Sequence, residues 1–195
     1  LFDVVKMMHH MALSSQTGLF SIKTKIIPVL FIFSGLPGTG KTTIAREIAK
    51  QRSAVCLRVD ALEQALVNVG LVNRQWDLGP AGYAAAYVLA ADNLRLGLSV
   101  VADSVNPLSI TRDAWRGVAV QEGANYLEIE TICSDTEQHR KRVEGRTSDI
   151  PGLVLPDWQS VQNRTYEPWD RKHLVVDTAK LQVDEAVDAI LKNVG

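Results

Sequence analysis

The sequence has little of three things: cysteine, net charge and long apolar stretches. Only two cysteines occur among 195 residues, the formal net charge is −1, and no apolar run approaches the roughly 18 residues of a membrane-spanning helix. Cys56 and Cys133 lie in apolar, strand-like runs, which favours buried free thiols over a disulfide and predicts a cytoplasmic protein. The near-neutral charge argues against broad, sequence-independent nucleic-acid binding, although a local basic patch is compatible with it.

The first 25 residues differ in composition from the rest of the chain. They carry His9 and His10 and then a polar stretch, without the basic segment and long apolar core of a signal peptide. We therefore expect a poorly ordered leader over 1–25, in which Met11 is a candidate start and the two histidines are not metal ligands. Residues 26–195 have the length of a single globular domain.

Strand-like and helix-like segments alternate through this domain. We expect strands at 29–34, 54–59, 98–102, 126–133 and 173–176, and helices ending near 51 and spanning 61–69, 80–96, 109–122, 136–144 and 184–192. This rhythm predicts an α/β fold of three layers, α/β/α, with a mostly parallel sheet. Right-handed crossovers then place the carboxyl ends of the strands along one edge, where ligands bind.

A phosphate-binding motif follows the first predicted strand. Residues 35–42 read G-x-x-x-x-G-K-T, in which glycines let the backbone turn and point its N–H groups at phosphate oxygens. Lys41 is expected to reach the β- and γ-phosphates, Thr42 to offer a hydroxyl to Mg²⁺, and the following helix to add the positive end of its dipole. The predicted nucleotide-binding residues are Gly35, Pro37, Gly38, Thr39, Gly40, Lys41, Thr42 and Thr43.

Two aspartates stand at the carboxyl ends of neighbouring predicted strands. Asp103 closes the 98–102 strand, where a carboxylate can hold Mg²⁺ beside the phosphates; the alternative is a cap for the turn that follows. Asp60 closes the 54–59 strand and is the candidate base that accepts the proton of a phosphate acceptor. Its alternative is an N-cap for the next helix, with Glu63 completing a partial capping pattern.

The strongest basic cluster spans 135–146. Arg142 and Arg146 share one face of the expected helix and could fold over the phosphates, where they would stabilise charge in phosphoryl transfer. The alternative is a solvated helix face, since Glu137–Lys141 and Arg140–Glu144 are i,i+4 pairs. The polar segment that follows, 145–169, is predicted to form a small closing lid.

Aromatic residues gather in or near this lid. Trp158, Tyr166 and Trp169, with Arg164 and Arg171 nearby, could stack on a base or a substrate ring, but such residues more often attach a loop to the body of a domain. The same alternatives apply, with less support, to Arg74 and Trp76.

With these features in order, residues 27–194 resemble the small P-loop kinases. This group includes chloramphenicol phosphotransferase, gluconate kinase, adenylylsulfate kinase and the kinase domain of polynucleotide kinases, and such sequences are often labelled AAA-type ATP-binding proteins. The segment 59–62 resembles the one that carries the acceptor-activating Asp, 142–146 resembles the R-x-x-x-R lid pattern, and 175–178 resembles the last strand and its loop near adenine. One departure is Glu63, where adenylylsulfate and polynucleotide kinases commonly have Arg.

The resemblance implies a P-loop NTPase fold with five parallel strands in the order 2-3-1-4-5. It further implies an ATP-dependent kinase that uses Mg²⁺ held by Thr42 and Asp103, with Asp60 as the base and a small hydroxylated molecule as acceptor. A nucleic-acid 5′ end, a sugar nucleotide, or a regulatory module with weak hydrolysis are the competing interpretations. The identity of the acceptor, ATP against GTP and the oligomeric state stay open, although no N-K-x-D guanine motif is present.

Overall fold

The computed structural model describes residues 27–194, so the predicted leader, with His9, His10 and Met11, lies outside the described residues. Strands are β1 (Val29–Ser34), β2 (Val55–Arg58), β3 (Val100–Asp103), β4 (Asn125–Ile132) and β5 (Leu174–Asp177). Helices are α2 (Lys41–Arg52), α3 (Val59–Asn68), η1 (Gln75–Leu78), α4 (Ala81–Arg95), α5 (Ser109–Gln121), α6 (Thr136–Gly145), α7 (Trp158–Gln162) and α8 (Val183–Leu191).

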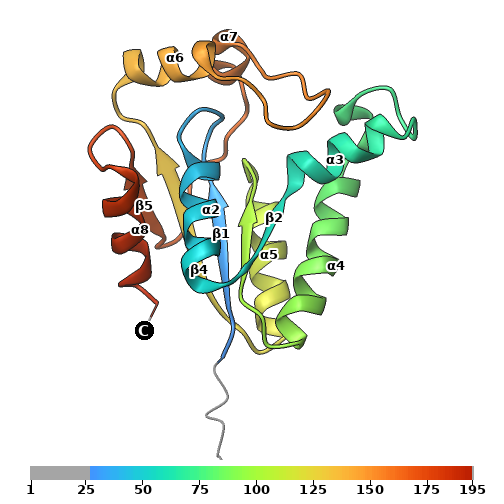
Figure 1. Cartoon of the computed structure of the whole chain (residues 1–195), viewed down its shortest axis with the longest axis vertical. Coiled ribbons are helices and arrows are strands. Elements are labelled where there is room, and N and C mark those ends of the chain that lie inside the picture. The colour runs from blue at the N-terminus through green and yellow to red at the C-terminus, as the bar shows by residue number, and fades with distance from the viewer. Residues whose placement is uncertain (1–26, 195) are drawn as a thin grey trace, which may run out of the picture.

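The strands form one parallel sheet in the order β2-β3-β1-β4-β5, as predicted. β1 is central and its six residues are all buried, which explains why it reads as a continuous apolar run rather than an alternating one. Helices α2 and α8 cover one face of the sheet, where Phe31 and Phe33 of β1 belong to the same buried cluster as Ile44 of α2. Helices α4 and α5 cover the other face through Leu30 and Trp115 (Figure 1). The predicted three-layer P-loop fold is therefore confirmed.

Two sequence expectations, the capping role of Asp60 and the shared helix face of Arg142 and Arg146, are wrong. Helix α3 begins at Val59, which is only 2% exposed, so Asp60 lies inside its first turn and makes no capping hydrogen bond. Helix α6 ends at Gly145 and Arg146 has extended backbone angles, φ −78° and ψ 149°. Arg142 and Arg146 therefore do not share one face of a helix.

The two cysteines are free thiols, but neither is buried as expected; both are partly exposed. No helix among residues 27–194 is long and apolar enough to cross a membrane. The segment after α6, which the sequence predicts as a lid, carries the short helix α7 and lies with α6 above the carboxyl ends of the strands (Figure 1).

Candidate functional site

The phosphate-binding loop joins β1 to α2 and has the backbone that its glycines allow. Gly38 and Gly40 have φ values of +86° and +90°, a conformation that costs other residues strain. A Cβ on Gly35 would lie 2.2 Å from the carbonyl oxygen of Thr131, so β4 leaves no room for a side chain there. The amide of Gly35 donates to Val105 O at 3.1 Å, which attaches the loop to the segment after β3.

Lys41 is the one buried cation of this loop, 7% exposed. Its Nζ donates to Leu36 O at 2.9 Å, so the side chain folds back over the loop in which phosphates would sit. Burial lowers the pKa of Lys41 to about 8, while the nearby carboxylates of Asp103 and Asp60 oppose that shift. The carboxylates of Asp60 and Asp103 therefore both act electrostatically on Lys41. This agrees with the sequence prediction that the P-loop and these two acids line the same crevice.

Asp103 and Thr42 form the candidate metal side of the site. Asp103 ends β3 and is 5% exposed, and the nearby Thr42 side chain favours its ionised form. Burial raises the pKa of Asp103, and Lys41 and Thr42 counter this shift. Its contacts run to the P-loop and to Arg58 rather than to the turn that follows, which disfavours the turn-cap alternative. Two oxygen donors suit Mg²⁺, which takes its remaining ligands from water and phosphates.

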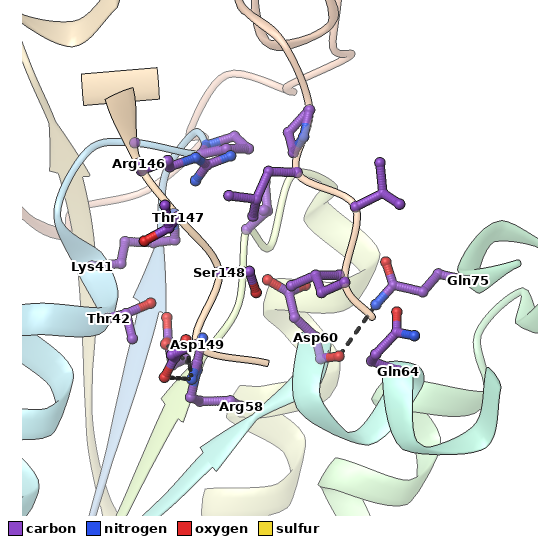
Figure 2. Close-up of a pocket in the computed structure, with 18 of the residues that line it drawn as sticks. Lys41, Thr42, Arg58, Asp60, Gln64, Gln75, Arg146, Thr147, Ser148 and Asp149 are labelled. Atoms are coloured by element: carbon purple, nitrogen blue, oxygen red, sulfur yellow. Dashed lines mark hydrogen bonds and ion pairs between the residues drawn. The ribbon is translucent and has the colours of Figure 1, made fainter. Parts of the chain in front are cut away.

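Asp60 lies on the opposite side of the cleft, in the first turn of α3. Its carboxylate is exposed, and among residues 27–194 no hydrogen bond or ion pair engages it; its backbone carbonyl accepts from Gln75 Nε2 at 3.2 Å (Figure 2). One turn along, Glu63 is half-buried against Gly82, where a Cβ would lie 2.2 Å from Glu63 Cγ. Burial, with help from Asp60, raises the pKa of Glu63 to about 7.

Helix α6 packs directly on the phosphate-binding loop. His139 Nε2 lies 2.8 Å from Pro37 O, and the ring is 7% exposed. A Cβ on Gly38 would lie 2.5 Å from Val143 Cγ2. The Trp158 ring of α7 meets the His139 ring edge-on, with centroids 5.1 Å apart. Sequence reasoning gave His139 and Val143 no role, because their partner is the backbone of a loop about a hundred residues earlier.

The two predicted lid arginines are placed differently. Arg142 donates to Thr178 Oγ1 at 2.7 Å and to Thr178 O at 3.0 Å, and Thr178 Oγ1 lies 3.0 Å from Thr39 O. Arg142 therefore connects α6 to the loop after β5. Arg146 lines the cleft, and its buried Nε and Nη2 atoms have no hydrogen-bond partner within residues 27–194. Burial lowers the pKa of Arg146, while the negative charge of Asp60 opposes this shift. The other basic residues form the expected pairs Arg140–Glu144 and Lys141–Glu137.

A charge network that the sequence did not reveal crosses the cleft. Asp149, in the segment after α6, is contacted by Arg46 of α2 and by Arg58 at the end of β2. The Arg58 Nη1 atom lies 2.9 and 3.1 Å from the two carboxylate oxygens of Asp149 (Figure 2). The Arg58 Nε atom lies 3.6 Å from Asp103 Oδ2. Hydrogen bonds from Arg58 and Arg46 lower the pKa of Asp149 to about 2, so the carboxylate is ionised at neutral pH.

The aromatic residues at the end of the lid segment attach the chain to the body of the domain. Trp169 stacks on His173 with centroids 4.0 Å apart, and the buried Arg112 lies over the rings of Trp169 and Tyr166. Arg112 also donates to the carbonyls of Glu167 and Pro168. Arg171 pairs with Glu128. The attachment alternative is therefore confirmed for these residues, whereas Arg164 lines the cleft.

These parts surround one cleft of about 1320 Å³ at the carboxyl ends of the strands. Its walls include Lys41 and Thr42 on one side, Asp60 and Gln64 on the other, and Arg146 from above. Thr43, the last predicted nucleotide-binding residue, also lines it, and so does Arg74. The candidate residues that the sequence placed at three separate strand ends thus border a single space large enough for a nucleotide and a second small molecule.

Comparisons with known proteins agree with this arrangement. An AAA domain family matches residues 30–164. An adenylyl-sulfate kinase from Synechococcus sp. is 25% identical over 177 residues, covering 83% of this chain and 90% of the relative. The structure of the Mycobacterium tuberculosis APS kinase in complex with AMPPNP and APS superposes with a TM-score of 0.63 at 18% identity, covering 86% and 98% of the two chains. A gluconokinase from Sinorhizobium meliloti gives 0.56 at 18% identity, covering 86% and 90%.

At 18% identity, the two solved structures support the fold alone. The family match covers more than half of the chain and therefore shows the family. The relatives are kinases, which confirms the prediction of a phosphotransferase. The chain therefore belongs to the AAA domain family, among its small P-loop kinases.

Proposed function

We propose that the protein transfers the γ-phosphate of ATP to a hydroxyl group of a small molecule, with Mg²⁺ as the required cation. One observation carries the proposal: Lys41 and Asp103 border the same cleft as the Asp60 carboxylate, which no hydrogen bond or ion pair engages within residues 27–194. A P-loop alone holds phosphates, but a free carboxylate across the cleft supplies what transfer to a hydroxyl needs, a group that accepts the proton.

Each residue then has a chemical role. Lys41 and the P-loop amides bind the phosphates and offset their charge. Thr42 and Asp103 would hold Mg²⁺, which supplies charge neutralisation on the phosphate oxygens. Arg146 brings a cation with unpartnered N–H groups to the cleft, where charge develops on the transferring phosphoryl group. Asp60 accepts the proton of the attacking hydroxyl.

Arg142 has a different role from the one predicted. Because both of its terminal nitrogens engage Thr178, it links α6 to the loop after β5. It lines the cleft at its P-loop side, close to the Thr39 carbonyl that Thr178 contacts. Arg142 thus supports the nucleotide side of the cleft, and Arg146 takes the catalytic part.

The cleft favours a small acceptor over a polymer. Asn68 Nδ2 of α3 donates to Pro151 O of the lid segment at 3.1 Å, so the lid touches α3 beside the Asp60 side of the cleft. Two of the cleft arginines, Arg46 and Arg58, are already paired with Asp149, and Arg58 also lies 3.6 Å from Asp103. A groove for a nucleic-acid strand would instead present unneutralised cations along its length.

The acceptor can be found by supplying ATP and Mg²⁺ with a panel of hydroxylated metabolites that includes gluconate and adenylyl sulfate, the acceptors named by the relatives. We expect a phosphorylated product with at least one small hydroxylated compound and none with a 5′-hydroxyl oligonucleotide. The E63R variant places Arg where adenylylsulfate kinases commonly have it, and a gain of activity toward adenylyl sulfate alone would show that Glu63 selects against it. Tight ATP binding with no product across the panel would instead support a regulatory module.

A further inference from the structure

The segment that joins α6 to α7 crosses the cleft with few apolar contacts. From Arg146 to Val154 no side chain is fully buried: Ile150 and Leu153 are partly covered, and Val154 is 87% exposed. The hydrophobic effect therefore fixes only part of the position of this segment. Polar contacts supply the rest, and these can be named individually.

The strongest of these contacts belongs to Asp149. Its carboxylate contacts guanidinium groups from two elements, Arg46 on α2 and Arg58 at the end of β2, the latter with both oxygens. A carboxylate held by two guanidinium groups forms a network and is worth more than an isolated surface pair. Figure 2 shows Asp149 beside Arg58, with Arg146 farther back along the same segment.

Arg58 is restrained by contacts that do not involve the segment 146–154. Its side chain is 17% exposed and its Nε lies 3.6 Å from the buried carboxylate of Asp103, itself a candidate metal ligand. Much of the entropy that a surface arginine loses on pairing is therefore already lost here. Asn68 adds a weaker contact through Pro151 O at 3.1 Å.

Arg146 depends on the same segment. It lies three residues before Asp149, outside the regular helix α6, and its buried Nε and Nη2 atoms have no partner within residues 27–194. No hydrogen bond within residues 27–194 holds either of these two atoms in place. On the C-terminal side of Arg146, the nearest ion pairs that restrain the chain are therefore those of Asp149 with Arg46 and Arg58.

We propose that Asp149, through Arg46 and Arg58, is a positioning residue that holds the segment 146–154 across the cleft and places Arg146 for phosphoryl transfer. The role given to Arg146 rests on the proposed function, whereas the attachment of the segment does not. Asp149 touches neither acceptor nor phosphate in this scheme. It acts by restraining the residue that does.

The first test measures the segment itself. Hydrogen exchange of the backbone amides in 147–154 is followed by mass spectrometry with AMPPNP and Mg²⁺, in the wild type and in D149N and R46A. We expect both variants to exchange about tenfold faster, because each removes a charge-assisted contact of an exposed segment. High salt should speed exchange in the wild type and have little effect in D149N. Equal exchange in the wild type and both variants would overturn the attachment, whatever the protein's activity.

The second test measures catalysis with a matched control. D149N should lower kcat about tenfold or more and leave KM for ATP within about twofold, since Lys41 and the P-loop are untouched. D149E, which keeps the charge, should recover most of kcat. E144Q removes a carboxylate of α6 that is paired with Arg140, and it should match the wild type in both assays. Faster exchange in D149N with an unchanged kcat would overturn the positioning role of Asp149 and contradict the proposed role of Arg146.

Discussion

Replacing Gly38 by alanine tests the packing of α6 on the phosphate-binding loop. Gly38 has φ +86°, and an added Cβ would lie 2.5 Å from Val143 Cγ2. The backbone conformation costs an alanine about 1–2 kcal/mol. Overpacking against a buried valine adds about 1–3 kcal/mol, because the atom that must give way is a branched side chain 4% exposed. We therefore expect G38A to lower the free energy of unfolding by about 2–5 kcal/mol.

Two further variants separate these contributions. Gly97 has a similar φ, +84°, with nothing within 4 Å of its Cβ position, so G97A should lose only the backbone part, about 1–2 kcal/mol. In G38A/V143A the overlapping methyl group is gone, and the double-mutant cycle should show a favourable coupling of at least about 1 kcal/mol. Urea unfolding at 25 °C of the wild type, G38A, G97A, V143A and G38A/V143A supplies the values that these comparisons need. A G38A protein as stable as G97A, with no coupling to Val143, would refute the packing of α6 on this loop.

Three other changes have definite expected outcomes. Because the folded protein raises the pKa of Glu63 to about 7 from 4.5, the unfolding free energy should fall by up to roughly 3 kcal/mol as pH rises from 4.5 through 7, and E63Q, measured by urea unfolding from pH 5 to 8, should remove that slope. D103N should reduce the gain in AMPPNP affinity on adding Mg²⁺ at least about tenfold by calorimetry, and an unchanged gain would exclude Asp103 from the metal site. R112M should lower the unfolding free energy by about 2–4 kcal/mol, since it leaves the carbonyls of Glu167 and Pro168 without donors, and R112K should not rescue it because an ammonium group cannot reach both; full stability of either variant would contradict this attachment.

The fold follows closely from the sequence. The 29–34 run is apolar without alternation because β1 is buried on both faces, and that pattern is typical of a central parallel strand. Glycines mark the P-loop, and Asp103 marks the end of β3, because each is required by local chemistry within a few residues. Signals of this kind can be read without knowing the tertiary structure.

The errors lie where a local pattern competes with burial. Asp60 has the composition of an N-cap, but α3 begins before it because Val59 packs into the core. Arg142 and Arg146 have helical spacing, yet α6 ends between them at Gly145. The spacing placed the start of α3 two residues late, whereas it placed the end of α6 within one residue but assigned Arg146 to a face of that helix.

The residues that the sequence did not reveal are joined by long-range contacts. Asp149 pairs with Arg58 across 91 positions and with Arg46 across 103, and neither arginine belongs to a motif. An arginine on a helix surface looks the same in a sequence whether it faces solvent or a carboxylate from another segment. Only the path of the chain after α6 brings these charges together.

The central claim is that Asp60 accepts the proton of the attacking hydroxyl, and the D60N variant tests it most directly. With an acceptor found in the panel, kcat and the affinity for AMPPNP with Mg²⁺ are measured for the wild type and D60N. The account predicts a fall in kcat of about 10²–10⁴-fold with nucleotide affinity within a few-fold, because the side chain keeps its shape and loses its basicity. An unchanged kcat at saturating ATP would contradict it.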